Sequence, residues 1–226
     1  MKELAEGIWQ LKGSLPIPNA VNTYLVEDVL IDAGARGDGK KILKQLEGRD
    51  LSAHALTHAH ADHQGSSRLV CETFGVPFWV PANDVEKAEG GAEAIKAEQP
   101  DTFISNFFIR TMAGPGHPVD RPLSEADTVA GFRVLDTPGH SKGHVSFWRE
   151  SDRVLILGDV MANMDVYTGI PGLREPKKAL TPDPARNRES ISRLGELEPS
   201  LVLFGHGAPL RDTRKFADFC ASVRSG

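Results

Sequence analysis

"LTHAHADHQG", residues 56–65, is the stretch of this 226-residue chain that decides the fold. It sets four potential metal ligands within six positions: His58, His60, Asp62 and His63. Residues two apart point the same way on an extended chain but roughly 200° apart on a helix, so the first two histidines can share one ion only outside a helix. Asp62 and His63 follow at the predicted first turn of a helix, within reach of a second ion. The spacing therefore favours two adjacent metal ions.

Three further candidate ligands each follow an apolar strand and stand beside a glycine. They are His140 in "DTPGHSKGH", Asp159 in "LILGDV" and His206 in "LFGHG". Ionisable side chains at such positions are costly to bury unless they are paired or bind a metal. A polar loop that happens to be rich in histidine is the alternative, but chance would give the opening spacing in about one chain in a thousand.

The motifs HxHxDH, TPGH, GD and GH occur in this order, and the series resembles the metallo-β-lactamase superfamily from about residue 21 to residue 210. The resemblance implies an α/β fold, a four-layer αββα sandwich with the metal site at one edge. It also implies the ligands: His58, His60 and His140 for the first metal, Asp62, His63 and His206 for the second, and Asp159 as the bridge between them. Two zinc ions are expected, with iron or manganese as alternatives, since histidine and carboxylate ligands suit all three metals.

The expected reaction is hydrolysis of an ester-type carbonyl substrate, a thioester or a lactone, by a binuclear metallohydrolase. Two metals lower the pKa of a shared water from about 15.7 to near neutrality, so hydroxide is the expected nucleophile. Asp62 is the expected catalytic residue, because it could orient the hydroxide and pass its proton to the leaving group. Phe107 and Tyr167 are expected to bind the substrate as walls of an apolar pocket. The alternative for Phe107 is that the phenylalanines of the 82–122 segment anchor that segment to the core.

Comparison with members of the superfamily that the chain resembles narrows the reaction. True β-lactamases have cysteine or serine where this chain has Asp159, which disfavours antibiotic hydrolysis. Glyoxalase II-like enzymes continue into a glutathione-binding helical part, whereas this chain stops twenty residues after His206. Acyl-homoserine lactonases carry a tyrosine at the position of Ala162. The alternative of another chemical class is a mononuclear iron persulfide dioxygenase, which the presence of His144 disfavours.

Composition and length bound the remaining expectations. The formal charge of -5 is spread along the chain, which argues against nucleic acid, and no run of 18 apolar residues indicates a membrane span. We expect a cytoplasmic protein that acts on a small molecule, with a homodimer left open. A single domain over residues 1–226 is expected, with residues 82–122 as an insertion that covers the substrate. Cys71 and Cys220 lack CxxC spacing and are expected to be buried free thiols.

Hydrophobic periodicity predicts the elements of the chain. In the first part of the chain it predicts a hairpin at 23–34 ending at Asp32, a helix at 37–48, a strand at 54–60, a helix at 62–75 and a strand at 76–81. In the later part it predicts strands within 131–160, a helix at 184–197, a strand at 201–207 and a helix from about Arg211. Residues 161–184 show no clear period and are expected to form a loop. The series strand, turn, strand, Asp, helix, strand, His occurs twice, which pairs Asp32 with Asp159 and His58 with His206.

Four residues outside the ligand set have weaker expectations. Asp32 is expected either to contact a ligating histidine or to cap its strand. His144 is expected to support the ligands without being one. His54 and His117 carry no motif and are expected to be exposed to solvent.

Overall fold

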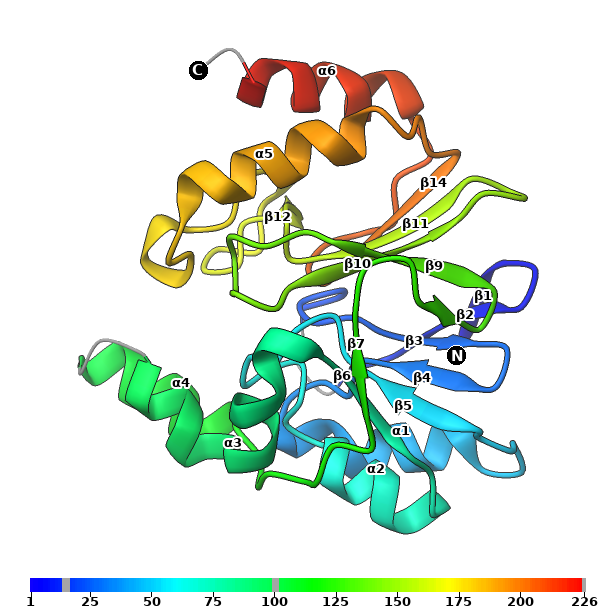
Figure 1. The fold of residues 1–226 in the computed structure, drawn as a ribbon, viewed down its shortest axis with the longest axis vertical. Coiled ribbons are helices and arrows are strands. Elements are labelled where there is room, and N and C mark those ends of the chain that lie inside the picture. The colour runs from blue at the N-terminus through cyan, green and yellow to red at the C-terminus, as the bar shows by residue number, and fades with distance from the viewer. Residues whose placement is uncertain (14–16, 99–101, 225–226) are drawn as a thin grey trace. The chain divides into compact units, whose positions relative to one another are not determined.

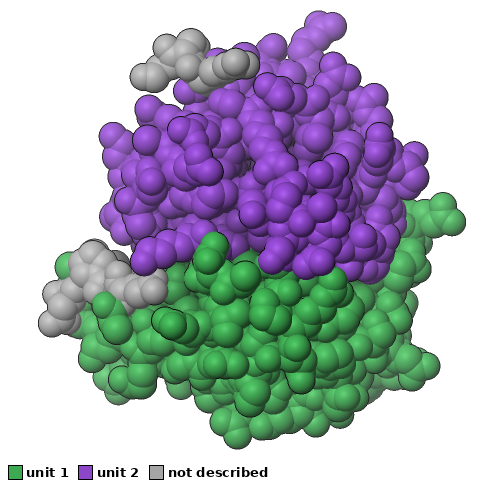
Figure 2. All heavy atoms as spheres, viewed as in Figure 1, with its two compact units in different colours: residues 1–123 green, residues 124–226 purple. Residues whose placement is uncertain are grey.

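The computed structural model describes residues 1–13, 17–98 and 102–224. The chain divides into two compact units, Met1–Leu123 and Ser124–Gly226, which Figure 2 distinguishes by colour. Each unit has one main β-sheet and its own helices (Figure 1). Among the described residues, none of the helices combines the length and the hydrophobicity that crossing a bilayer requires.

The first unit has a seven-stranded sheet in which the strands follow one another in chain order. Its strands are β1 (Lys2–Ala5), β2 (Ile8–Leu11), β3 (Thr23–Val26), β4 (Val29–Ile31), β5 (Ala53–Ala55), β6 (Phe78–Pro81) and β7 (Arg121–Leu123). Neighbours are antiparallel up to β4 and parallel from β4 to β7. The predicted hairpin at 23–34 is confirmed as β3 and β4, whereas β1 and β2 were not predicted.

Helices supply the crossovers that parallel strands require in this unit. They are η1 (Arg36–Asp38), α1 (Gly39–Leu46), α2 (Ser67–Phe74), η2 (Ala82–Asp84), α3 (Val85–Glu98) and α4 (Phe103–Met112). Ile42 and Leu46 of α1 and Val70 of α2 pack with Leu25 and Leu30 of the sheet in one buried cluster. The apolar faces of α1 and α2 are thereby buried against the strands, which is the main source of their stability.

The predicted start of the second helix at Asp62 is wrong. The helix α2 begins at Ser67, and residues 61–66 form turns instead. The carbonyl oxygen of His60 accepts hydrogen bonds from the N–H groups of both His63 and Gln64, at 3.0 Å each, which closes a tight turn before the helix. The end of the helix is as predicted, since Gly75 takes a left-handed conformation and its N–H bonds to the carbonyl of Cys71.

The second unit has a five-stranded sheet in the order β14-β11-β10-β9-β8. Its elements are β8 (Thr128–Val129), β9 (Phe132–Asp136), β10 (Val145–Arg149), β11 (Val154–Gly158), β12 (Ala162–Met164), β13 (Pro171–Arg174), η3 (Lys178–Leu180), α5 (Pro184–Gly195), β14 (Leu201–Phe204) and α6 (Thr213–Arg224). The expected loop at 161–184 is wrong in part, because β12 and β13 pair there as an antiparallel ribbon.

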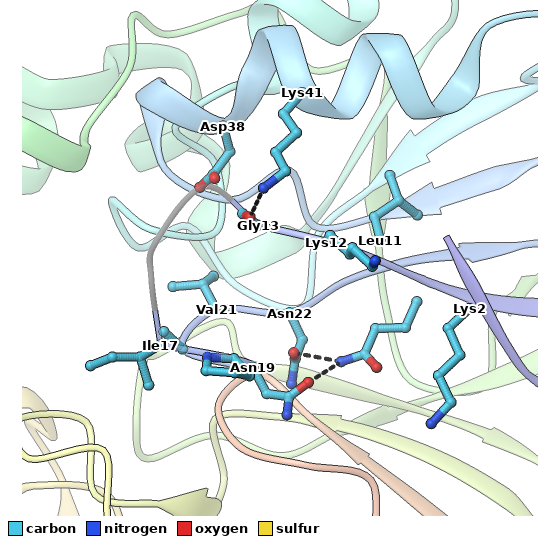
Figure 3. Close-up of a pocket in the computed structure, with 13 residues that line it drawn as sticks. Lys2, Leu11, Lys12, Gly13, Ile17, Asn19, Val21, Asn22, Asp38 and Lys41 are labelled. Carbon is cyan, nitrogen blue, oxygen red and sulfur yellow. Dashed lines mark hydrogen bonds between the residues drawn. The ribbon is translucent and has the colours of Figure 1, made fainter.

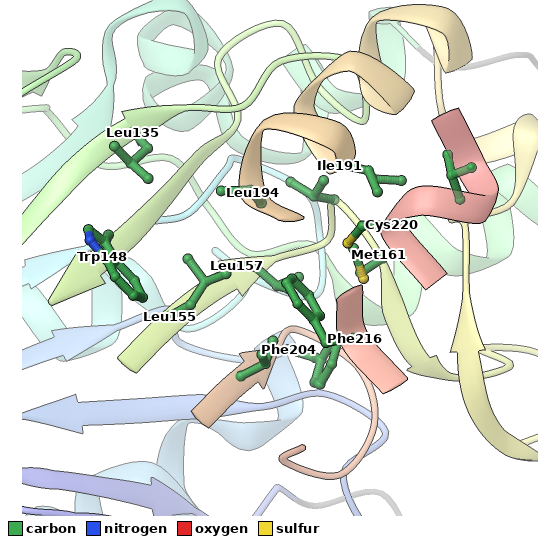
Figure 4. Close-up of a cluster of buried hydrophobic side chains, with 13 residues drawn as sticks. Leu135, Trp148, Leu155, Leu157, Met161, Ile191, Leu194, Phe204, Phe216 and Cys220 are labelled. Atoms are coloured by element: carbon green, nitrogen blue, oxygen red, sulfur yellow. The ribbon is translucent and has the colours of Figure 1, made fainter. Parts of the chain in front are cut away.

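Helices α5 and α6 cover one face of the second sheet (Figures 1 and 4). Leu194 of α5 and Phe216 of α6 share a buried cluster with Leu155 and Leu157 of β11 and Phe204 of β14. The next residues along β11 and β14, on the opposite face, are buried as well. Strands buried on both faces appear in sequence as continuous apolar runs, which is how "VLILG" and "LVLF" were recognised.

The repeated series in the sequence corresponds to repeated topology. In the first unit β3 and β4 are antiparallel, and β5 follows α1 to lie parallel to β4. In the second unit β10 and β11 are antiparallel, and β14 follows α5 to lie parallel to β11. Asp32 directly follows β4 and Asp159 directly follows β11, so the pairing of these two residues inferred from sequence matches their places in the two units.

Candidate metal centre

The two histidines of the THAH segment converge within the first unit. His58 and His60 lie on the irregular segment that follows β5, and His58 Nε2 is 3.0 Å from His60 Nδ1. Their ring centroids are 4.5 Å apart. Side chains two apart meet in this way only when the segment is not helical, as the spacing predicted.

The buried carboxylate of Asp32 contacts a third histidine of this segment, His63. Asp32 Oδ2 lies 2.9 Å from His63 Nδ1, and both side chains are buried. The same carboxylate accepts hydrogen bonds from the Thr57 N–H at 2.8 Å and from the Thr57 hydroxyl at 2.9 Å. Because His63 donates from Nδ1, its lone pair is on Nε2. The contact with a predicted ligand, one of the two expected roles of Asp32, is therefore found.

The Thr57 hydroxyl also fixes the tautomer of His58. A hydroxyl has one proton, and Thr57 gives it to Asp32, which can only accept. The 3.0 Å contact between Thr57 Oγ1 and His58 Nδ1 is then a hydrogen bond donated by the imidazole. The lone pair of His58 is left on Nε2, on the side that faces His60. This arrangement is the one that metal-binding histidines adopt.

Asp62 is the carboxylate of the first cluster that solvent can reach. Its side chain is 22% exposed, whereas the side chain of His63 is fully buried. Asp62 Oδ2 lies 3.9 Å from His63 Nε2, the nitrogen with the lone pair. A group at this position can both bind an ion beside His63 and exchange a proton with solvent.

The second unit gathers the other three predicted ligands around one carboxylate. Asp159 Oδ2 lies 3.0 Å from His206 Nε2 and 3.5 Å from His140 Nε2. All three side chains are at least nine-tenths buried. One carboxylate oxygen therefore faces two imidazole nitrogens, an arrangement suited to an ion on each side.

Glycines beside two of these ligands are required by the close approach of backbone. Gly139 precedes His140 with φ +135°, and a Cβ there would lie 2.3 Å from the N atom of Asn187. Gly207 follows His206 with φ +102°, and a Cβ there would lie 2.4 Å from a backbone carbon of Asn163. The TPGH and GHG motifs thus combine a ligand with a turn that other residues would obstruct.

His144 supports the cluster of the second unit, as expected. Its Nε2 accepts a hydrogen bond from the backbone N–H of Asp159 at 2.9 Å, and its Nδ1 lies 2.9 Å from the hydroxyl of Thr137. An Nε2 that accepts from an N–H has no lone pair left for a metal. His144 therefore holds the turn that presents Asp159 and is not itself a ligand.

Two expectations about other histidines are corrected. His54 is wholly buried, with Nδ1 3.0 Å from the Leu30 carbonyl oxygen and Nε2 2.8 Å from Ser67 Oγ. Burial lowers the pKa of His54 to about 4. His117 is half-buried, with its ring 6.0 Å from that of Phe78. Both histidine rings lie near Phe78 of β6. Their burial depends on this contact with a distant residue, which the sequence around each histidine does not reveal.

The expected substrate contacts are exposed side chains. Phe107 of α4 is 56% exposed, and Tyr167, in the turn between β12 and β13, is 51% exposed. The Lys177 ammonium lies 5.3 Å from the centre of the Tyr167 ring, which orients the ring by a cation–π interaction. Ala162 is buried at the start of β12.

A pocket of the first unit is lined by residues other than the histidine cluster. It has a volume of about 350 Å³, and Figure 3 shows its lining. Gln10 Nε2 donates to Asn22 Oδ1 at 2.7 Å and to Asn19 Oδ1 at 3.0 Å, and Lys41 Nζ donates to the Gly13 carbonyl. None of the predicted ligands is among its lining residues.

One residue beside the histidines was missed by the sequence reasoning. Asp84 Oδ2 accepts a hydrogen bond from the N–H of Ala59, the residue between His58 and His60, at 2.8 Å. The position of Asp84 shortly after the buried strand β6 was the signal that could have found it.

The donors of each unit fit divalent transition metals. Imidazole nitrogens with the lone pair on Nε2, together with carboxylates, are the usual ligands of zinc, iron and manganese in proteins. The partners on the far side of the rings, Asp32 and Thr57, are of the kind that fixes such ligands.

Known proteins match the chain along most of its length. The model of the metallo-beta-lactamase superfamily matches residues 16–206. The probable metallo-hydrolase YflN of Bacillus subtilis is 31% identical over 80% of this chain and 76% of that protein. The hydroxyacylglutathione hydrolase GloC of Haemophilus influenzae is 26% identical over 58% of this chain and 60% of that protein.

Similarity of structure agrees with similarity of sequence. A crystal structure of a metallo-beta-lactamase family protein from Thermus thermophilus has a TM-score of 0.71 and 26% identity, and the match covers 99% of this chain and 81% of that one. The α/β fold predicted from the order of the motifs is confirmed. The chain belongs to the metallo-beta-lactamase superfamily.

Proposed function

We propose that this protein is a metal-dependent hydrolase that cleaves an ester-type carbonyl substrate, a thioester or a lactone, with two metal ions. The ions are taken to be zinc, and residues 1–226 are taken as a single domain. The proposed ligands are His58, His60 and His140 for the first ion, Asp62, His63 and His206 for the second, and Asp159 for both.

The position of Asp159 carries the proposal for two metals. Its Oδ2 is within 3.5 Å of both His140 Nε2 and His206 Nε2. These two histidines are assigned to different ions, so a carboxylate that faces both has the place of a bridging ligand.

Residues around the ligands prepare them for binding. Asp32 and Thr57 hold His63 and His58 with their Nε2 lone pairs available, so no tautomer change is needed when a metal binds. His144 fixes the backbone N–H of Asp159. The two units thus support their ligands by different partners, a carboxylate in the first and an imidazole in the second.

The bound metals would supply Lewis acidity, polarising the substrate carbonyl and lowering the pKa of a water from about 15.7 to about 7. The chain itself supplies a proton acceptor, the Asp62 carboxylate, which is partly open to solvent beside the buried His63. Asp62 accepts the proton of the attacking water and returns it to the leaving group. General acid–base catalysis of this kind contributes about 10²- to 10⁴-fold to the rate.

One relative and two exposed aromatic rings support the proposed substrate class. Among the relatives, GloC is named a hydroxyacylglutathione hydrolase, which supports an acyl substrate for this chain. Phe107 and Tyr167 are large apolar side chains left more than half exposed. We assign both to contact with an apolar acyl group. Ala162 stands where lactonases of the superfamily carry a tyrosine, so a thioester fits better than an acyl-homoserine lactone.

Elemental analysis of the protein as isolated, combined with activity assays, tests the proposal. The expected result is about two zinc ions per chain and hydrolysis of at least one member of a panel of thioesters, lactones and aryl esters. His140→Ala should abolish hydrolysis, and His117→Ala, a histidine outside the ligand set, should not. One iron per chain with oxygen uptake on a persulfide would contradict the proposal and favour the dioxygenase alternative.

A further inference from the structure

The carboxylate of Asp84 holds the backbone between two proposed ligands. Asp84 ends η2, and its side chain is fully buried. Its Oδ2 accepts a 2.8 Å hydrogen bond from the N–H of Ala59. That N–H lies between His58 and His60 in the chain, so the bond fixes the peptide that connects the two rings.

A second charged group is buried with this carboxylate. Lys87, in the first turn of α3, has a side chain that is 7% exposed, and its Nζ lies 3.5 Å from Asp84 Oδ1. Buried ion pairs add little stability compared with apolar residues of similar size, because both charges lose their hydration. A positional role therefore explains this buried pair better than a contribution to stability does.

The side chain of Ala59 also helps to fix the position of the segment between the two histidines. It is fully buried in a cluster with Leu56 and Phe78, and Ala88 of α3 belongs to the same cluster. In a strand, alternate side chains point in opposite directions. The irregular segment after β5 is arranged in a related way, since Ala59 packs into this cluster while the nitrogens of its neighbours, His58 Nε2 and His60 Nδ1, lie 3.0 Å apart.

We propose that Asp84, paired with Lys87, is a positioning residue that sets the convergence of His58 and His60 on a metal. The inference rests on the proposed metal site. The start of the 82–122 segment then holds the ligand segment in place, in addition to any role of that segment in covering the substrate. Asp84 acts on the ligands through the Ala59 N–H and not by contact with the metal.

Metal affinity, measured on the full chain, tests this role. The variants are Asp84→Ala, which removes the acceptor, and Asp84→Asn with Lys87→Met, which keeps an oxygen acceptor but removes both charges. Asp120→Ala is the matched control, because Asp120 Oδ2 accepts a hydrogen bond of the same 2.8 Å from the N–H of Phe78. Zinc affinity is measured by competition with a chelator, the cobalt(II) visible spectrum reports ligand geometry, and Tm of the metal-free protein reports stability.

The expected result is a loss of zinc affinity of about tenfold or more in Asp84→Ala, with an altered cobalt spectrum, which is the usual effect of losing a partner of a metal ligand. Asp84→Asn with Lys87→Met should stay within about threefold of the wild type, and Asp120→Ala should do so even if its Tm falls. If Asp84→Ala does not fold, the single variant Asp84→Asn replaces it. The single amide oxygen of this variant would turn to the Lys87 ammonium, so it would no longer accept from the Ala59 N–H. We therefore expect this variant to bind zinc more weakly, and the addition of Lys87→Met to restore the affinity.

Two results would overturn the inference. One is an affinity and a cobalt spectrum in Asp84→Ala that match those of Asp120→Ala. The other is a double variant that binds zinc as weakly as Asp84→Ala, since the acceptor would then be irrelevant. A wild-type chain that binds no metal would instead contradict the proposed function, so the two failures are distinguishable.

Discussion

His63 Nδ1 lies 2.9 Å from Asp32 Oδ2, and both side chains are buried. The two residues are 31 positions apart, yet the contact decides which nitrogen of His63 offers a lone pair. The carboxylate also receives the Thr57 hydroxyl, which in turn orients His58. One buried charge therefore prepares two of the proposed ligands.

Asp32→Asn should weaken metal binding by about 10- to 100-fold, because the neutral amide accepts weakly from His63 and no longer fixes its tautomer. The expected outcome is loss of one of the two metals after dialysis, measured by elemental analysis, with a parallel fall in hydrolysis. Asp38→Asn is the control, since Asp38 is also a buried carboxylate but accepts from the N–H of Ala35. Two metals retained in Asp32→Asn at wild-type affinity would refute the role of Asp32.

Asp62→Ala separates proton transfer from binding of the first metal. Turnover should fall about 100-fold or more, because the proposed proton acceptor is lost. The first metal should remain, since His58, His60 and His140 are unchanged. Elemental analysis and turnover on the same preparation make the comparison, with the exposed Asp50 changed to Ala as the control. Near-normal turnover in Asp62→Ala would exclude it as the proton acceptor.

The ligands were recognisable in the sequence because each follows an apolar strand at a tight turn. His140 and His206 stand beside glycines that close backbone contacts require, so strand, glycine and ligand form a local signature. The repeated topology placed Asp32 and Asp159 at equivalent strand ends. The local sequence pattern was sufficient to predict these ligands because the turns that present them depend on neighbouring residues in the chain.

The predictions that failed depend on partners far along the chain. The ribbon of β12 and β13 is held by Asp165, which pairs with Arg174 and Lys177, and its edge bridges to Gly207 through Asn163. The strand β1 is mostly exposed and has no alternating pattern to detect. The pattern of residues 62–75 as a whole predicts a helix from Asp62, whereas the hydrogen bonds from the N–H groups of His63 and Gln64 to the His60 carbonyl favour a turn at its start.

The two cysteines, confirmed as free and buried, should be unreactive in the folded protein. Burial raises the pKa of both Cys71 and Cys220 to about 12. At pH 8 their thiolate fraction is then about a thousandfold smaller than that of an ordinary cysteine, and thiolate is the reactive form. Ellman's reagent should therefore detect two thiols in denaturant and almost none without it. A thiol of the folded protein that reacts as fast as free cysteine would contradict the assignment.

His54 should make the first unit sensitive to acid. Its pKa is about 4 in the folded protein against an ordinary value of 6.5, because the buried ring is desolvated. Between these two values the unfolded chain takes up a proton that the folded chain does not. His54 therefore does not change the free energy of unfolding above about pH 6.5. It lowers that free energy as the pH falls from about 6.5 towards 4, and it has no further effect below pH 4. The loss at pH 4.5 is roughly 2–3 kcal/mol.

Urea denaturation of wild type and His54→Gln at pH 7.5 and pH 4.5, in a chelator so that metal release does not contribute, measures this effect. At pH 7.5 the variant should be less stable, since it loses the stacking of His54 on Phe78 at 5.2 Å and strains the bonds to Leu30 and Ser67. The variant cannot titrate at this position, so its stability should fall between the two pH values by roughly 2–3 kcal/mol less than that of the wild type. Equal losses in both proteins would show that His54 is not the acid-sensitive group.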